Sequence, residues 1–245
     1  MAKSDKSKSE RAKEMLRQQQ RRERMRNLSV IAVVVVAVLV VVGVALYVQS
    51  NRDTTGKAAK DIPANLTGTY SVTIGQASAP TTVKLYEDLQ CPICKQFEAA
   101  TGQQVRAAIA AGKVKVEYHM VAFLDRSSTT QYSSRALNAA MAVLDTAGPD
   151  AFLKFHTLAY ANQPAEGTAG VPDSTLIQWA VQAGADRSKV TPLINGNVYH
   201  QWVVNATDQM SQDGVNGTPT VYINGKEQNP DNPSAAAQAL LAAVK

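Results

Sequence analysis

The only two cysteines of this 245-residue chain lie in the stretch Lys84-Leu85-Tyr86-Glu87-Asp88-Leu89-Gln90-Cys91-Pro92-Ile93-Cys94. They follow an apolar, strand-like run and open a helix-like run. A disulfide between them would close a very small ring. In the loop-entropy model it would stabilise the fold by roughly 2 kcal/mol, which is little for a structural disulfide. A close pair of thiols at a strand-to-helix junction suits chemistry better, because one thiol can attack while the other resolves.

The junction itself favours a reactive thiol. If a helix begins here, Cys91 is its N-cap and Pro92 lies in its first turn, where a missing N–H costs nothing. The helix N-terminus then stabilises a thiolate, so we expect Cys91 to be exposed with a lowered pKa and Cys94 to be shielded. Zinc is the alternative, but zinc takes about four ligands and the three histidines of the chain are widely scattered. We therefore expect no metal and no bound cofactor.

The formal charge of +5 is concentrated in the first 27 residues, which carry ten Lys and Arg against four acidic residues, a net +6. The remaining chain is near neutral, at −1, which argues against nucleic acid as its main ligand. Residues 28–48 follow as an almost unbroken apolar run of 21 residues without charge. This run is long enough for a transmembrane helix and longer than the apolar core of a cleaved signal peptide.

These segments predict a membrane-anchored organisation. Residues 1–27 are expected to be a basic cytoplasmic tail, because positive flanking charge stays inside, and residues 28–48 a single transmembrane helix. Residues 49–68 have the composition of a linker, and residues 69–245 form the extracytoplasmic domain. That compartment permits disulfides, so the paired thiols would work where oxidation is available.

The pattern after the linker predicts an α/β domain with a helical insertion at about residues 122–213. The apolar spacing and the turn residues mark the elements, with a hairpin turn expected at Asn224-Gly225. The expected elements are strands at 70–75, 82–86, 113–121 and 220–223, a short strand from 226, and helical segments at 97–111, 132–144, 150–160, 174–183, 197–212 and 233–244.

With this organisation the chain resembles the DsbA-like thiol–disulfide oxidoreductases, in particular the membrane-anchored members of the actinobacterial cell envelope. Tyr86-Glu87-Asp88 leads into Cys91-Pro92-Ile93-Cys94, and a helical block separates the two halves of the domain. The third feature is Gly217-Thr218-Pro219-Thr220-Val221-Tyr222-Ile223-Asn224-Gly225, which matches the family's cis-proline loop. The resemblance covers about residues 68–245 and implies a thioredoxin fold with an inserted helical domain.

The resemblance also implies roles for the site residues. Cys91 would be the nucleophilic sulfur that links to substrate, and Cys94 the resolving thiol of the same redox-active disulfide. Pro219 is expected to be cis and to pack beside the disulfide, with Thr218 presenting backbone groups to a bound peptide. Pro92 and Ile93 are expected to contact substrate as well.

Two departures from the family pattern matter for the chemistry. Strongly oxidising relatives have His where this chain has Ile93, and many relatives bury an acid six residues before the first cysteine, where this chain has Leu85. Glu87 and Asp88 are closer to the cysteines and could shuttle protons. They could equally be solvated or cap the helix.

The implied activity is thiol–disulfide exchange that introduces disulfides into exported proteins by way of a mixed disulfide. The implied partners are reduced or unfolded exported proteins and a membrane quinone-linked reoxidant, such as a vitamin K epoxide reductase homologue. Two alternatives stay open. One is the same chemistry in reverse, as an envelope reductase or isomerase, and the other is a tethered peptide-binding or chaperone-like module.

Overall fold

The structure, a computed structural model, describes residues 56–229 and 232–245. The predicted cytoplasmic tail (1–27), the predicted transmembrane helix (28–48) and the start of the predicted linker therefore lie outside the described residues. Within the described ranges, none of the helices has the length and apolar character needed to span a bilayer.

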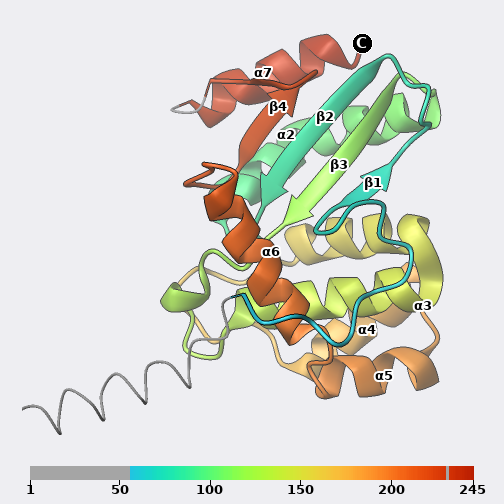
Figure 1. Cartoon of the computed structure of the whole chain (residues 1–245), viewed down its shortest axis with the longest axis vertical. Helices are drawn as coiled ribbons and strands as arrows, with labels where there is room; N and C mark the ends of the chain where they lie inside the picture. Colours follow the sequence, from blue (N-terminus) through green and yellow to red (C-terminus); the bar gives the residue numbers. More distant parts are fainter. Residues whose placement is uncertain (1–55, 230–231) are drawn as a thin grey trace, which may run out of the picture. The chain divides into compact units, whose positions relative to one another are not determined.

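A mixed sheet, with five strands in the described ranges, forms the centre of the domain in the order β1-β3-β2-β4-β5 (Figure 1). The strands are β1 (Val72–Ile74), β2 (Thr81–Glu87), β3 (Val114–Met120), β4 (Thr220–Ile223) and β5 (Lys226–Glu227). β2 and β3 are parallel, whereas the pairings of β1 with β3, of β2 with β4 and of β4 with β5 are antiparallel. A parallel pair needs a crossover connection, and α2 (Pro92–Ala110) supplies it.

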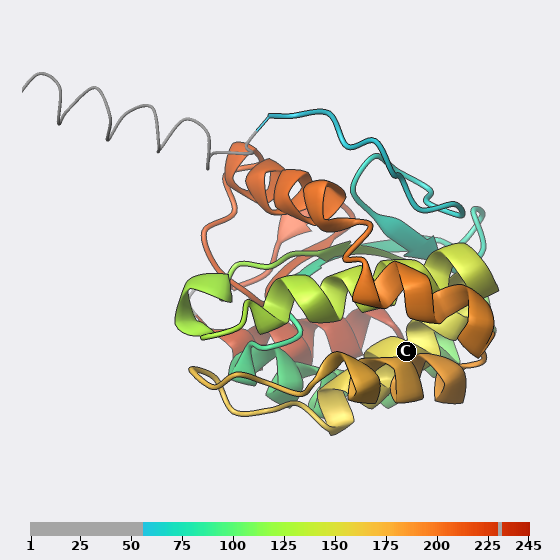
Figure 2. The same cartoon turned by 90° about the horizontal axis from the view of Figure 1, so that it is seen from below.

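Helices cover both faces of this sheet. α2 and α7 (Pro233–Ala243) pack together on one face, and α6 (His200–Gln212) crosses the opposite face (Figures 1 and 2). The inserted helices are α3 (Tyr132–Ala161), α4 (Asp173–Ala183) and α5 (Arg187–Asn195), which contact one another, and α3 also contacts β1 and α2. A short 3-10 turn, η1 (Asp125–Ser127), connects β3 to α3.

The buried row of side chains on β2 explains where the core lies. Side chains alternate along a strand, so Val83, Leu85 and Glu87 point to the same face, toward α2 and α7. Val116 and Tyr118 of β3 stand beside Val83 and Leu85 in register and extend this apolar surface. Glu87 is therefore the last member of an otherwise apolar row, and it is fully buried.

The element order agrees with the sequence prediction, with three differences. α5 was not expected, because its segment is short, polar and interrupted by Pro192. The two helices expected at 132–144 and 150–160 form one helix that kinks at Gly148, where φ is 81°. α2 starts at Pro92, as predicted from the cysteine junction, and so begins before the segment 97–111 that the apolar spacing marked; the proline at its first position supports the extra turn.

Two glycines with similar positive φ angles allow a test of the close approach between β1 and β3. Gly75 has φ of 117°, and a Cβ there would lie 2.6 Å from the carbonyl oxygen of Val114. Gly184, with φ of 114°, has open space around the same position. We expect Gly75→Ala to lower the free energy of unfolding more than Gly184→Ala. Both substitutions incur strain of about 1–3 kcal/mol, but only the first adds a clash with backbone.

Denaturant unfolding of the two variants measures this difference. Equal losses of stability in the two variants would show that the adjacent ends of β1 and β3 can move apart without a loss of free energy.

Candidate active site

Cys91 and Cys94 lie at the junction between β2 and α2. Cys91 is the N-cap of α2 and Pro92 is its first residue, as the sequence predicted. Both cysteines are free thiols. The first N–H groups of a helix have no intrahelical acceptor, so the start of α2 presents donors to the sulfur of Cys91.

The pKa of Cys91 is lowered to about 6 by hydrogen bonds. The largest contribution is the hydrogen bond that the thiol of Cys94 donates to it. Burial acts in the opposite direction, but the side chain of Thr218 and the backbone N–H groups of Cys94 and Ile93 lower the pKa further. Cys91 can therefore carry a thiolate at neutral pH, which is the reactive form in thiol–disulfide exchange.

Cys94 has the opposite character. Burial raises the pKa of its thiol well above the ordinary value, and the hydrogen bond to Cys91 and the negative charge of Glu87 raise it further. The backbone N–H of Asp88 hydrogen-bonds to the sulfur and acts in the opposite direction. The two thiols thus differ in the way that an attacking and a resolving thiol must.

The expectation of an exposed Cys91 was wrong. Cys91 is 6% exposed, more than Cys94 at 0%, but it is still buried. The reason is the loop before β4: the thiol of Cys91 donates a hydrogen bond of 3.3 Å to the carbonyl oxygen of Thr218. The Thr218–Pro219 peptide bond is cis, as expected. Because Thr220 pairs with Tyr86 in the sheet, this loop lies beside the first turn of α2.

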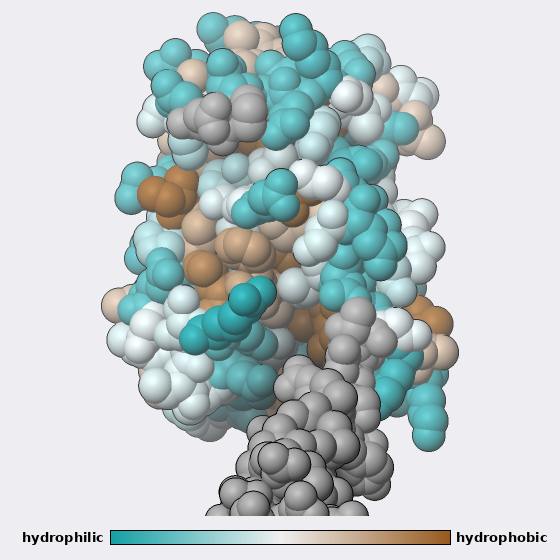
Figure 3. Space-filling model, turned by 60° about the vertical axis from the view of Figure 1, so that its left-hand side comes forward, coloured by the Kyte–Doolittle hydropathy of each residue, from teal (hydrophilic) through white to brown (hydrophobic). Residues whose placement is uncertain are grey.

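The residues expected to contact substrate lie at the edge of this site. Ile93 is 40% exposed, and Pro92 and Pro219 are partly buried. A cavity of about 240 Å³ extends from Ile93 between α2 and α7, with Phe97 and Leu241 among its lining residues. Figure 3 shows one face of the molecule, on which apolar surface gathers in the middle and polar surface surrounds it.

Glu87 and Asp88 are not solvated, because both are fully buried. Neither caps α2, whose N-cap is Cys91 and whose start has no side-chain cap hydrogen bond. Oε2 of Glu87 lies 2.8 Å from Nε2 of His156, which comes from α3. Burial raises the pKa of Glu87, although the charge and hydrogen bond of His156 partly oppose it. The pKa of His156 is also raised: burial lowers it, but the charge and hydrogen bond of Glu87 prevail.

Asp88 has a different environment. One of its carboxylate oxygens accepts hydrogen bonds from the N–H of Gln90 and the hydroxyl of Ser133, each 2.7 Å long. The other accepts one of 2.8 Å from the N–H of Leu124. Burial raises the pKa of Asp88 to about 7, against the effect of these bonds. Both carboxylate oxygens of Asp88 thus accept hydrogen bonds, and these bonds connect the cysteine segment to Leu124 and Ser133.

The sequence did not identify the side chains of the insertion that reach the cysteine segment. Tyr160 donates a hydrogen bond of 3.1 Å to the carbonyl oxygen of Asp88. Gln163 donates to the carbonyl oxygens of Leu89 and Cys91, at 3.1 and 2.9 Å. The spacing of Phe152, His156 and Tyr160 puts three rings on one face of a helix and was the available signal for a buried histidine. Gln163 carries no such signal.

Alkylation across pH tests this electrostatic arrangement. We expect iodoacetamide to modify Cys91 of the reduced chain with a midpoint near pH 6, and Cys94 to react much more slowly. Cys94→Ala should raise the midpoint, because it removes the largest stabilising hydrogen bond. Cys94→Ser should raise it less, because its hydroxyl still donates. An unchanged midpoint in Cys94→Ala, or labelling mainly at Cys94, would contradict the assignment.

Comparisons with known proteins agree with this geometry. The family model described as thioredoxin matches residues 67–243. The serine/threonine-protein kinase PknE of Mycobacterium tuberculosis is 27% identical over 170 residues, which cover 66% of this chain. The match spans only 30% of the length of that kinase.

Two solved structures of Mycobacterium tuberculosis proteins are also similar. Oxidised DsbA is 33% identical with a TM-score of 0.59, and the match covers 71% of this chain and 92% of that one. Reduced DsbG is 33% identical with a TM-score of 0.61, and the match covers 71% and 87%. Fold, paired thiols and these similarities lead to one conclusion: the chain belongs to the thioredoxin family and is a DsbA-like protein disulfide oxidoreductase.

Proposed function

We propose that this chain introduces disulfides into exported proteins by exchange through Cys91-Pro92-Ile93-Cys94. The observation that carries the proposal is the stabilised thiolate of Cys91, whose pKa is lowered to about 6. A low thiol pKa stabilises the dithiol relative to the disulfide, and a disulfide with a stabilised reduced form is oxidising. This asymmetry supports net oxidation of substrates.

In this mechanism a substrate thiolate attacks Cys91, the less buried sulfur, and Cys94 leaves. The substrate's second thiolate then attacks the substrate sulfur of the mixed disulfide, and Cys91 leaves as a thiolate. Thr218 and Pro219 would contact the bound peptide from one side of Cys91. Pro92 and Ile93 would contact it from the other, with the cavity between α2 and α7 receiving an apolar side chain.

The sequence supports the proposed location, and the resemblance to DsbA-like proteins supports the proposed partners. The basic tail and the 21-residue apolar run support a single-pass protein of the cell membrane, with a cytoplasmic N-terminus and the catalytic domain outside. A domain tethered there would meet exported proteins as they emerge. It would also lie beside membrane quinones, which supports reoxidation by a quinone-linked protein such as a vitamin K epoxide reductase homologue.

Reduction or isomerisation is the second candidate, and two residues favour it. Ile93 has no hydrogen-bond donor or positive charge to offer the Cys91 thiolate, and Thr218 before the proline resembles isomerases and reductases. A peptide-binding module is a third reading. Replacing both cysteines with serine separates it from the other two, because a binding module would keep its cellular phenotype.

The reduction potential decides between oxidation and reduction. Equilibration of the full chain with glutathione should give a value between roughly −270 mV, typical of thioredoxin, and roughly −120 mV, typical of the strongest oxidants, nearer the latter. Ile93→His should raise the potential by adding a donor to the thiolate. Gln104→His, on an exposed part of α2, is the matched control and should leave it unchanged. A value at or below that of thioredoxin would favour the reductase.

Protease accessibility tests the proposed topology. Protease added to intact spheroplasts should digest the large domain and spare an N-terminal tag, because only the domain would be external. Digestion of the tag with protection of the domain would reverse the orientation.

A further inference from the structure

The turn formed by residues 88–91, which we call the cysteine turn, leads directly into α2. The N–H of Cys91 closes it with a hydrogen bond of 3.0 Å to the carbonyl oxygen of Asp88. The carbonyl oxygen of Cys91 in turn accepts a hydrogen bond of 3.1 Å from the N–H of Lys95, in the first turn of the helix. The conformation of the cysteine turn therefore sets the direction of the first N–H groups of α2 relative to the sulfur of Cys91.

Two side chains that follow from α3 bind three of the four carbonyl oxygens of the cysteine turn. The hydroxyl of Tyr160 donates to that of Asp88, at 3.1 Å. Nε2 of Gln163 donates to those of Leu89 and Cys91, at 3.1 and 2.9 Å. A carboxamide nitrogen carries two N–H donors, whereas a hydroxyl has only one. A single glutamine can therefore bridge two carbonyl oxygens in a way that Ser, Thr or Tyr cannot.

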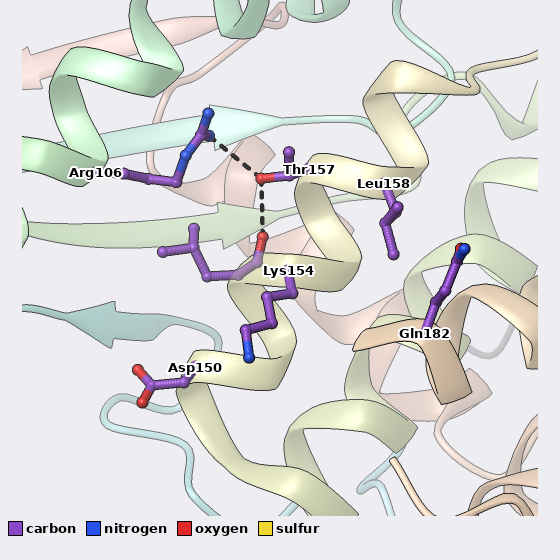
Figure 4. Close-up of a pocket in the computed structure, with 7 residues that line it drawn as sticks. Arg106, Asp150, Lys154, Thr157, Leu158 and Gln182 are labelled. Atoms are coloured by element: carbon purple, nitrogen blue, oxygen red, sulfur yellow. Dashed lines mark hydrogen bonds between the residues drawn. The ribbon is translucent and has the colours of Figure 1, made fainter. Parts of the chain in front are cut away.

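The segment that carries Gln163 is fixed on its N-terminal side. Gln163 is the second residue after the end of α3 at Ala161, and its own N–H donates to the carbonyl oxygen of Tyr160 at 3.3 Å. Figure 4 shows Arg106 reaching from α2 to Thr157 in this part of α3, where it donates a hydrogen bond of 3.2 Å. The end of α3 is thus tied to the helix whose start Gln163 binds.

The loop that follows Gln163 is fixed as well. Arg135, near the start of α3, donates hydrogen bonds of 3.0 Å to the carbonyl oxygens of Ala169 and Val171. It also pairs with the carboxylate of Asp173, the first residue of α4, at 2.6 Å. Gln163 therefore lies between two anchored segments, and these hold its side chain against the cysteine turn.

The donors that stabilise a thiolate on Cys91 depend on the backbone of this residue. They are the thiol of Cys94 and the N–H groups of Ile93 and Cys94, all from the first turn of α2. Cys91 has the extended conformation of an N-cap, with φ of −72° and ψ of 118°. Rotation about this ψ would swing the carbonyl oxygen of Cys91 and the N–H groups after it together. A hydrogen bond to that oxygen opposes the rotation.

We propose that Gln163 is a positioning residue of the exchange reaction, which binds the carbonyl oxygens of Leu89 and Cys91 so that the donors of the first turn of α2 stay directed at the sulfur of Cys91. The proposal rests on the exchange at Cys91 and Cys94. Gln163 acts through the backbone of the cysteine turn and takes no part in bond making or breaking. It gives the inserted segment control over the thiolate, in addition to a share of the core.

Alkylation of the full, reduced chain by iodoacetamide across pH tests this role. Methionine is about as long as glutamine but has no N–H donor. We expect Gln163→Met to raise the midpoint of Cys91 alkylation from near pH 6 by about one unit, which corresponds to about 1.4 kcal/mol. Gln178→Met makes the same change at an exposed position of α4 and should leave the midpoint unchanged. A wild-type midpoint in Gln163→Met would overturn the proposal.

A second variant at the same position separates hydrogen bonding from packing. Gln163→Lys keeps several N–H donors and adds a positive charge, so its midpoint should equal that of wild type or fall below it. A rise as large as that of Gln163→Met would overturn the proposal. Gln163→Met replaces one neutral side chain by another, so it leaves unchanged the charges of the ionisable groups that interact with Cys91, which are Glu87, Asp88, Cys94 and Tyr160.

Equilibration with glutathione gives an independent readout. At pH 8, above both midpoints, Gln163→Met should shift the equilibrium toward the disulfide by up to about tenfold, which corresponds to a potential about 30 mV lower. The sign follows because a less stabilised thiolate makes the reduced form less favourable. Failure of wild type itself to exchange with glutathione would count against the exchange reaction, whereas an unchanged equilibrium in the variant would count against Gln163 alone.

Denaturant unfolding distinguishes positioning from general stabilisation. If Gln163 only stabilised the fold, Gln163→Met would lower the free energy of unfolding equally in the oxidised and reduced forms. We expect the reduced form to lose more, because only this form carries the thiolate. Equal losses would overturn the proposal.

Hydrogen exchange of side-chain amides tests the contact without a mutation, and so covers the case in which Gln163→Met does not fold. Both N–H protons of the Gln163 side chain are hydrogen-bonded to the cysteine turn. They should therefore exchange with solvent more slowly than those of the exposed Gln178. Equally fast exchange at the two glutamines would overturn the proposal.

Discussion

The hydrogen bond from Cys94 to the sulfur of Cys91 is the interaction on which the chemistry of this site depends. It makes the largest contribution to lowering the pKa of Cys91 to about 6, and the same contact helps to raise that of Cys94. One contact thus separates two identical thiols into a thiolate at Cys91 and a protonated, more deeply buried partner at Cys94. It requires the two sulfurs to stay within one helical turn, so the start of α2 must be held firmly.

The inserted helices supply much of that restraint. Gln163 binds two carbonyl oxygens around Cys91, and Tyr160 and Ser133 bind the backbone and the carboxylate of Asp88. β2, α2 and β3 form a parallel pair with its crossover helix, and these contacts reach it from outside that unit. The insertion therefore has a direct part in positioning the cysteines, in addition to enlarging the core.

The buried Glu87–His156 pair is difficult to explain by stability alone. Removing two charges from water costs several kcal/mol for each ion, and apolar residues of similar volume often serve a core as well or better. The pair also has two buried atoms without hydrogen-bond partners among the described residues, which adds to the cost. Many buried ionisable groups with shifted pKa values lie at functional sites, and the charge of Glu87 acts on the resolving thiol.

The sequence by itself determined the position of the cysteines at a strand-to-helix junction and the order of the elements apart from α5, because strand alternation, Pro92 and the spacing of the cysteines are local signals. The sequence prediction left Glu87 open as a proton shuttle, a solvated residue or a helix cap, although side chains two apart on a strand point the same way and Val83 and Leu85 precede it. Only the tertiary structure decided what surrounds it. His156 is 69 residues from Glu87, and the loop at Thr218 that buries Cys91 is 127 residues from it. Contacts over such separations depend on how the insertion and β4 pack against the sheet, which no local pattern encodes.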